Sequence, residues 1–199
     1  MKHRNLSVAL VWATVLFLTG CGNTGKPAFL STDITGADFG KGFKLADHTG
    51  KIRSLDDFKG KAIVLFFGYT HCPDICPATM GELTGALQKL GKDAARVQVL
   101  FVTVDPERDT PAVLKQYLSA FNPTFLGLSG DAQATRDIAN EFKVVYQKQI
   151  GKLPDHHTMD HSSGAYIFDP NGKIRLYVSN GAGTDIFVQD IAELLKTSG

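Results

Sequence analysis

The sequence has no surplus of charge of either sign, few cysteines and no repeated or compositionally biased segments. Its 21 lysines and arginines nearly balance 20 aspartates and glutamates, giving a formal net charge of +1. A chain without a basic surplus has little to attract a phosphate backbone, which argues against nucleic-acid binding. The 199 residues, 43% of them hydrophobic, suit one domain of ordinary globular composition.

The apolar stretch near the N-terminus is too short to span a membrane comfortably. Residues 7–17 are almost wholly apolar and follow two basic residues, as in a secretory signal peptide. The next residues, LTGC at 18–21, resemble the bacterial lipobox, in which the cysteine is lipidated and the chain is cleaved before it. We therefore expect residues 1–20 to be a lipoprotein signal peptide and Cys21 to be lipidated. An uncleaved N-terminal anchor is the alternative.

Either form of attachment places the rest of the chain outside the cytoplasm, on the periplasmic side of a bacterial membrane. Residues 21–40 begin with small and polar residues and show no periodicity, which predicts a flexible tether. Residues 41–199 are then the folded domain.

Cysteines are scarce for an oxidising compartment. With Cys21 lipidated, Cys72 and Cys76 are the remaining thiols. A disulfide that closes so small a loop stabilises a fold little, so a purely structural bond is disfavoured. The pair is expected to be a redox disulfide or part of a metal site.

Apolar runs without alternation predict two central strands. Residues 61–68 and 97–104 have this pattern, which is typical of strands covered on both faces. Shorter segments on either side are expected to form two β-hairpins. Their strands are residues 43–45 with 52–54, and 166–168 with 174–178.

Four helices are expected around these strands, because apolar residues recur at helical spacing after proline, aspartate or threonine. They cover residues 77–90, 111–121, 131–142 and 184–195, with Thr184 as the cap of the last. This order of strands and helices predicts one α/β domain of thioredoxin-like fold. Its central mixed sheet would be flanked by helices and accompanied by an N-terminal β-hairpin.

The first central strand leads into GYTHCPDICP at residues 68–77. Cys72 and Cys76 each precede a proline, which disfavours helical geometry and predicts both in the turn before a helix that begins at Pro77. A helix N-terminus favours an anion, so we expect lowered thiol pKa values. The spacing permits either a disulfide or a shared metal ion.

Two thiolates select copper(I) or zinc, and an imidazole is the usual third donor. The candidates are His48, His71, His156, His157 and His161. The side chain of His71 is expected to point away from the adjacent Cys72. His161 is expected at a loop end, where functional residues concentrate. We expect the segment before it, with His156, His157 and Met159, to be an exposed polar loop rather than an auxiliary copper site.

Three stretches together resemble the signature of the Sco/SenC family. They are GYTHCPDICP at 68–77, VDPERDTP at 104–111 and DHS at 160–162. The resemblance covers the chain from about residue 40 and implies a thioredoxin-like fold. In that family two cysteines and a distal histidine bind copper, and the protein helps to assemble the CuA centre of cytochrome c oxidase.

Carried over by position, the copper ligands are Cys72, Cys76 and His161. The implied partner is the CuA subunit of cytochrome c oxidase or another periplasmic copper protein. Within the second stretch, Asp105 is expected at the sheet edge that carries the cysteine loop, whereas Asp109 is expected to cap the next helix. The family usually has a membrane helix as its anchor, and the lipobox cysteine takes that place here.

Three functions compete. The first is a copper chaperone, which is not an enzyme. The second is a thiol–disulfide reductase with Cys72 and Cys76 as its redox pair. A peroxiredoxin-type peroxidase is disfavoured, because it expects threonine where Tyr69 stands. General oxidoreductases of this fold carry a cis-proline just before the strand near residues 163–168, where this chain has His161. Metal binding is therefore favoured.

Overall fold

The computed structural model describes residues 28–151 and 157–197. The predicted signal peptide and Cys21 lie outside these ranges, and so does His156. Among the described residues, no helix has the length and apolar character needed to cross a membrane.

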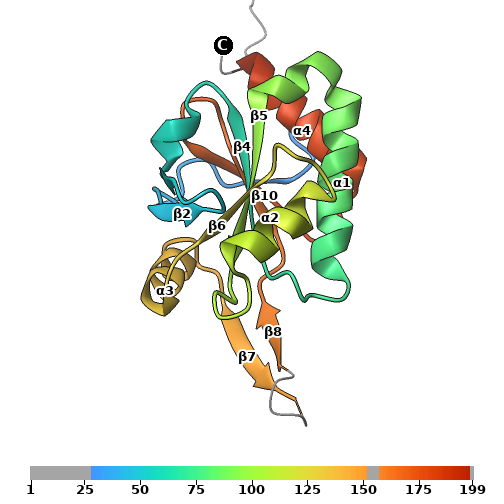
Figure 1. Cartoon of the computed structure of the whole chain (residues 1–199). Coiled ribbons are helices and arrows are strands. Elements are labelled where there is room, and N and C mark those ends of the chain that lie inside the picture. The colour runs from blue at the N-terminus through green and yellow to red at the C-terminus, as the bar shows by residue number, and fades with distance from the viewer. Residues whose placement is uncertain (1–27, 152–156, 198–199) are drawn as a thin grey trace, which may run out of the picture.

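An eight-stranded mixed sheet forms the centre of the molecule, in the order β1-β10-β9-β4-β5-β6-β2-β3 (Figure 1). Strands β4, β5 and β6 are parallel to one another, and the remaining pairs are antiparallel. The bounds are β1 Thr32–Asp33, β2 Leu45–Asp47, β3 Ile52–Arg53, β4 Ala62–Gly68, β5 Val97–Thr103, β6 Leu126–Ser129, β9 Ala165–Phe168 and β10 Ile174–Val178. Strands β4 and β5 are buried throughout, as their continuous apolar runs predict.

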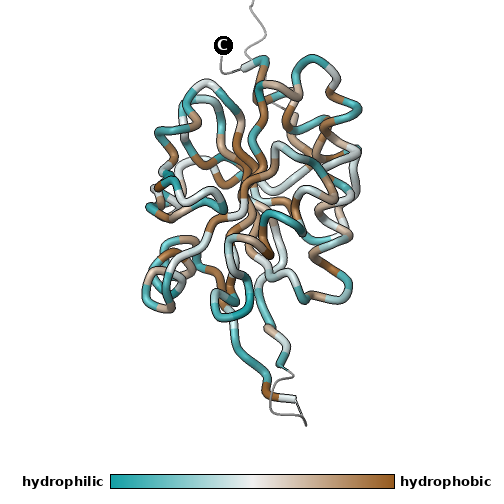
Figure 2. Tube along the Cα trace, viewed as in Figure 1, coloured by the Kyte–Doolittle hydropathy of each residue, from teal (hydrophilic) through white to brown (hydrophobic). Residues whose placement is uncertain are grey.

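Helices cover both faces of the sheet and divide the core into two clusters. Helices α1 (Ile75–Leu90), α2 (Pro111–Ser119) and α4 (Thr184–Thr197) pack on one face. Helix α3 (Ala132–Glu141) and the short 3-10 helix η1 (Leu55–Phe58) pack on the other. Successive residues of β4 enter opposite clusters, so its apolar run supplies both halves of the core (Figures 1 and 2).

A two-stranded antiparallel hairpin of β7 (Tyr146–Ile150) and β8 (His157–His161) projects beyond the main sheet (Figure 1). Its register pairs Tyr146 with His161 and Ile150 with His157. Strand β7 is mostly exposed, and Figure 2 shows the hairpin as largely hydrophilic. A strand of this kind has no buried face, so its sequence carries no alternation of apolar and polar residues, and we did not predict it.

The first helix begins earlier than its prolines indicate. Helix α1 starts at Ile75, so Cys76 lies inside its first turn and Pro77 at its third residue. The prediction that both cysteines precede the helix is therefore wrong for Cys76. A proline is tolerated in the first turn because its missing N–H has no intrahelical partner there.

The described part of the predicted tether is packed against the domain. Strand β1 pairs with β10, and the buried carboxylate of Asp190 in α4 accepts the backbone N–H groups of Leu30 and Ser31. Glycine 40 donates its N–H to the carbonyl of Glu141. Ordered backbone contacts with the domain thus begin by residue 30.

Candidate metal centre

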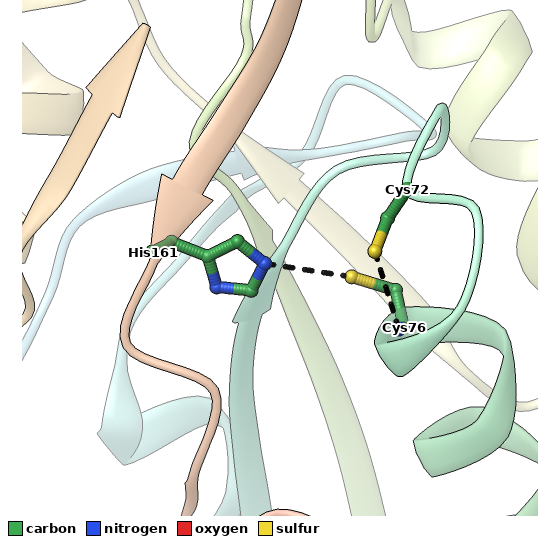
Figure 3. A group of neighbouring side chains, drawn as sticks. All are labelled: Cys72, Cys76 and His161. Carbon is green, nitrogen blue, oxygen red and sulfur yellow. Dashed lines mark hydrogen bonds between the residues drawn. The ribbon is translucent and has the colours of Figure 1, made fainter. Parts of the chain in front are cut away.

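Three side chains from three elements meet at the carboxyl end of β4. Cys72 lies in the turn after β4, Cys76 in the first turn of α1, and His161 at the end of β8 (Figure 3). The two Sγ atoms and the imidazole nitrogen all lie within 4.8 Å of one another. Cys76 Sγ is 3.7 Å from His161 Nε2. The fold therefore brings together the three residues that the sequence singled out, although the histidine is 85 residues from the nearer cysteine.

The turn that carries Cys72 is anchored by Asp109, whose side chain is 1% exposed. Its carboxylate accepts hydrogen bonds from the Thr70 backbone at 3.0 Å and the Thr70 hydroxyl at 2.6 Å. It also accepts from the Thr103 hydroxyl at 2.6 Å. The prediction that Asp109 caps the next helix is wrong, because Thr110 caps α2 by accepting from the N–H of Val113. Asp109 instead ties the cysteine turn to the end of β5.

Cys72 is partly exposed and lies against the start of α1. Its N–H donates to the carbonyl of Tyr69 at 3.2 Å, which closes the turn. The backbone N–H of Cys76 points at Cys72 Sγ over 3.5 Å (Figure 3). The sulfur of Cys72 therefore faces the start of α1.

Cys76 lies in a different environment, fully buried in the core cluster under α1. Burial raises the pKa of the Cys76 thiol, and the neighbouring Cys72 adds to this shift. The expectation of a lowered pKa is therefore wrong for this cysteine, because its side chain faces the core rather than the open helix end. The Cys76 sulfur can pack closely against β4 because residue 68 is glycine. A Cβ atom at that position would lie 2.8 Å from Cys76 Sγ.

The imidazole of His161 is held in one tautomer. Its Nδ1 lies 2.9 Å from the carbonyl oxygen of Ser162. A carbonyl only accepts, so Nδ1 carries the proton and the lone pair of Nε2 faces Cys76. Burial lowers the pKa of His161, which keeps the ring neutral at neutral pH. A neutral imidazole whose other nitrogen is fixed by a backbone carbonyl is the form that binds metals.

The other described histidines lie away from the two sulfurs. His48 Nδ1 accepts the N–H of Gly127, and His71 is exposed beside Thr70. His157 lies 3.0 Å from Asp105. His157 and Met159 belong to β8 and are largely buried, so the expected exposed loop is wrong for these two residues.

A second group of potential ligands lies beside the first. Atoms of Asp105, Glu107 and His157 lie within 4.8 Å of one another. Two cations already neutralise its carboxylates, because Arg108 pairs with Asp105 at 2.5 Å and Lys148 pairs with Glu107 at 2.6 Å. The carboxylate oxygens of this group are hard donors whose charge is already balanced by Arg108 and Lys148. The sulfurs of Cys72 and Cys76 are soft donors.

A cleft of about 360 Å³ opens beside the three residues and gives access to them. Cys72 and His161 line it, together with Tyr69 and Met159. Cys76 does not line it and is fully buried. A ligand that enters the cleft therefore meets one sulfur and the imidazole first.

Sequence reasoning missed three residues that surround this centre. Tyr69 packs its ring edge-on to His161 at 5.9 Å, and Phe66 does so at 6.3 Å. Arg108 donates to the carbonyl of His157 in the same strand as His161. Arg108 lies within the VDPERDTP stretch, but only the fold shows that it contacts the hairpin.

Comparisons with known proteins agree with this architecture. The sequence model of the SCO1/SenC family matches residues 31–196. An SCO2-like protein of Rickettsia felis is 42% identical over 135 residues, which cover 67% of this chain and 66% of the relative.

Two solved structures share the fold. The structure of Bradyrhizobium japonicum ScoI with copper bound is 38% identical, with a TM-score of 0.70 over 81% of this chain and 99% of that one. Apo Sco1 of Thermus thermophilus is 39% identical, with a TM-score of 0.75 over 84% and 97%. The predicted thioredoxin-like α/β fold is confirmed, and the chain belongs to the SCO1/SenC family.

Proposed function

We propose that the protein is a copper chaperone that holds the ion through Cys72, Cys76 and His161. The observation that carries this proposal is the meeting of two sulfurs and a neutral imidazole nitrogen within 4.8 Å. Two thiolates and an imidazole suit copper(I), and the related ScoI of Bradyrhizobium japonicum has been solved with copper bound. From the family resemblance, the acceptor is the CuA centre of cytochrome c oxidase.

Release of the ion follows from the unequal exposure of its ligands. Cys72 and His161 face the cleft, so sulfur or nitrogen donors of an acceptor reach the ion from that side. Cys76 stays behind the ion and is the last protein ligand to be exchanged. Binding requires Cys76 to lose its proton, and its raised pKa makes copper affinity increase with pH.

The test is a copper(I) titration under anaerobic conditions against a competing chelator. Wild-type protein should bind one equivalent, and Cys72→Ser and His161→Ala should each weaken binding by at least about tenfold, as expected when a direct ligand is lost. Incubation of the loaded protein with a reduced CuA domain should then move copper to that domain. Equal affinity in all three proteins would refute the ligand assignment.

A thiol–disulfide reductase is the second candidate, favoured by the partly exposed Cys72 beside the buried Cys76. The Cys72 thiolate would attack a partner disulfide, forming a mixed disulfide and releasing one partner thiol. Cys76 would then displace the second partner thiol, leaving a Cys72–Cys76 disulfide and a reduced partner. In this case Cys76→Ser traps the mixed disulfide, and the wild-type protein exchanges rapidly with a dithiol probe without binding copper.

For its location, we propose a lipoprotein on the periplasmic side of a bacterial membrane. The leader at residues 1–20 and the lipobox cysteine at residue 21 support this location. A lipid anchor would hold residues 41–199, the predicted copper-binding domain, near a membrane-bound oxidase.

A further inference from the structure

The outer edge of β8 receives a hydrogen bond from a side chain, Arg108, rather than from another strand. Among the described residues, β8 pairs only with β7. In an antiparallel pair, alternate residues direct their backbone groups away from the partner strand. The carbonyl of His157 accepts from Arg108 Nη1 at 3.0 Å on this side. Tyr69 and Met159, which lies two residues after His157, line the same cleft.

Arg108 is itself fixed by a buried carboxylate. Its Nε donates to Asp105 Oδ2 at 2.6 Å, and Asp105 is only 3% exposed. The same Oδ2 lies 3.0 Å from Nε2 of His157, so one carboxylate holds both the arginine and the strand residue. The guanidinium also lies 5.9 Å from the centre of the Tyr69 ring. These contacts join the turn after β5 to the hairpin.

This network bears on the position of His161. The hairpin is separate from the main sheet, and His161 is the last residue of β8, four positions after His157. The ring of Tyr69, over which Arg108 lies, also packs edge-on against the ring of His161. The distance between the imidazole and the sulfurs therefore depends on how firmly β8 is held against the body of the domain.

We propose that Asp105 and Arg108 are positioning residues for His161 and act by fixing β8. The inference rests on the proposed function, because it assigns a role in copper binding to residues that do not touch the ion. The alternative, a second metal site at Asp105, is opposed by Arg108. Its guanidinium already occupies the carboxylate and places a positive charge where a cation would bind.

The test compares Arg108→Gln with Lys148→Gln as the matched control. Lys148 forms an exposed ion pair with Glu107 that bridges the same turn and hairpin, so its loss is expected to change little. The first measurement is amide hydrogen exchange of β8 in the metal-free protein. The second is copper(I) affinity by chelator competition. We expect faster exchange and about tenfold weaker binding for Arg108→Gln, as for loss of other groups that orient a metal ligand.

Arg108→Lys keeps the positive charge beside Asp105 but lacks the Nη1 group that donates to the carbonyl of His157. It should fold as the wild type does and show intermediate exchange and affinity. Wild-type values in Arg108→Lys would overturn the inference even if Arg108→Gln unfolds. The inference would also be overturned if Arg108→Gln kept the wild-type hydrogen exchange and copper(I) affinity while His161→Ala bound copper(I) weakly. Unchanged affinity in His161→Ala would instead refute the proposed function.

Discussion

Cys72 and Cys76 are four residues apart but differ in exposure and surroundings. Cys72 lies partly exposed in a turn and faces an N–H group of the helix start, whereas Cys76 is fully buried. A soft ion bound by both sulfurs, as we propose, would be buried at Cys76 and accessible at Cys72. This asymmetry is what a carrier requires, because its cargo must be retained and yet exchanged.

Replacing Gly68 with alanine should disturb the buried sulfur directly. The new methyl group would lie 2.8 Å from Cys76 Sγ and 3.0 Å from the Phe101 ring. Overpacking of this kind costs about 1–3 kcal/mol of unfolding free energy. We also expect weaker copper binding, measured by chelator competition alongside urea unfolding.

The control for this substitution is Gly81→Ala in α1, where a Cβ atom meets nothing within 4 Å. It should raise stability by up to about 1 kcal/mol through helix propensity. If Gly68→Ala matched this control in both stability and copper affinity, the packing of Cys76 described above would be wrong.

Asp109→Asn should loosen the cysteine turn. An amide supplies one acceptor oxygen where the carboxylate accepts three hydrogen bonds, and its NH2 group faces donors. Leaving buried donors unpaired costs about 1–3 kcal/mol. Thermal unfolding measures this loss of stability.

Asp131→Asn is the matched control, since the exposed Asp131 caps α3 and asparagine caps equally well. Similar stability in the two variants would count against the anchoring role.

At this scale, the sequence pointed to the three residues that the fold brings together but not to their environments. The cysteine pair was evident from its spacing, and His161 was selected from five histidines by the family resemblance. The burial of Cys76 was not predictable, because it depends on where α1 begins and on the missing side chain at Gly68. Asp109 was misassigned because an aspartate before a helix resembles a cap.

Among the secondary-structure elements, those with long apolar runs or helical apolar spacing were predictable, whereas the short strand β6 and the β7–β8 hairpin were not. Strands β4 and β5 and the four helices follow from their apolar patterns. The β7–β8 hairpin has no such pattern, and Arg108 contacts it through the backbone carbonyl of His157. The element that carries His161 was therefore one that sequence periodicity could not reveal.

The β2–β3 turn should make stability depend on pH through Asp47, which is completely buried. Burial alone would raise its pKa, but hydrogen bonds from Thr49, Arg53 and Lys51 outweigh this and lower the pKa to about 2. A carboxyl with a depressed pKa stabilises the fold above its unfolded value near 3.8, and this contribution is lost as pH falls towards 2.

The contribution of Asp47 should amount to about 2 kcal/mol at neutral pH. Asp47→Asn should therefore be less stable at pH 7 and show a flatter decline in stability between about pH 5 and pH 2. Urea unfolding across this range measures both effects. A variant whose pH dependence paralleled that of the wild type would show that other carboxyls account for acid unfolding.

On the scale of the whole molecule, the site lies where the carboxyl ends of parallel strands meet the projecting hairpin (Figure 1). Ligands of open α/β sheets commonly bind at this edge. The fold class followed from the order of elements, and the family followed from three short motifs. The cleft beside Cys72 was not predictable, because it forms between segments almost 90 residues apart.

Attachment to the membrane should depend on Cys21. Cys21→Ser removes the sulfur that would carry the lipid, so the protein should leave the membrane fraction on cell fractionation. Cys72→Ser is the control and should stay with the membrane, because its sulfur belongs to the domain. If the Cys21→Ser protein remained in the membrane fraction, the N-terminal segment would be acting as an uncleaved anchor.

The most direct test of the three-residue centre is X-ray absorption spectroscopy of the protein loaded with one equivalent of copper(I). We predict two sulfur ligands and one imidazole nitrogen in the wild type, and loss of the nitrogen with both sulfurs retained in His161→Ala. An identical spectrum in the wild type and His161→Ala, or a copper site without sulfur, would contradict the account.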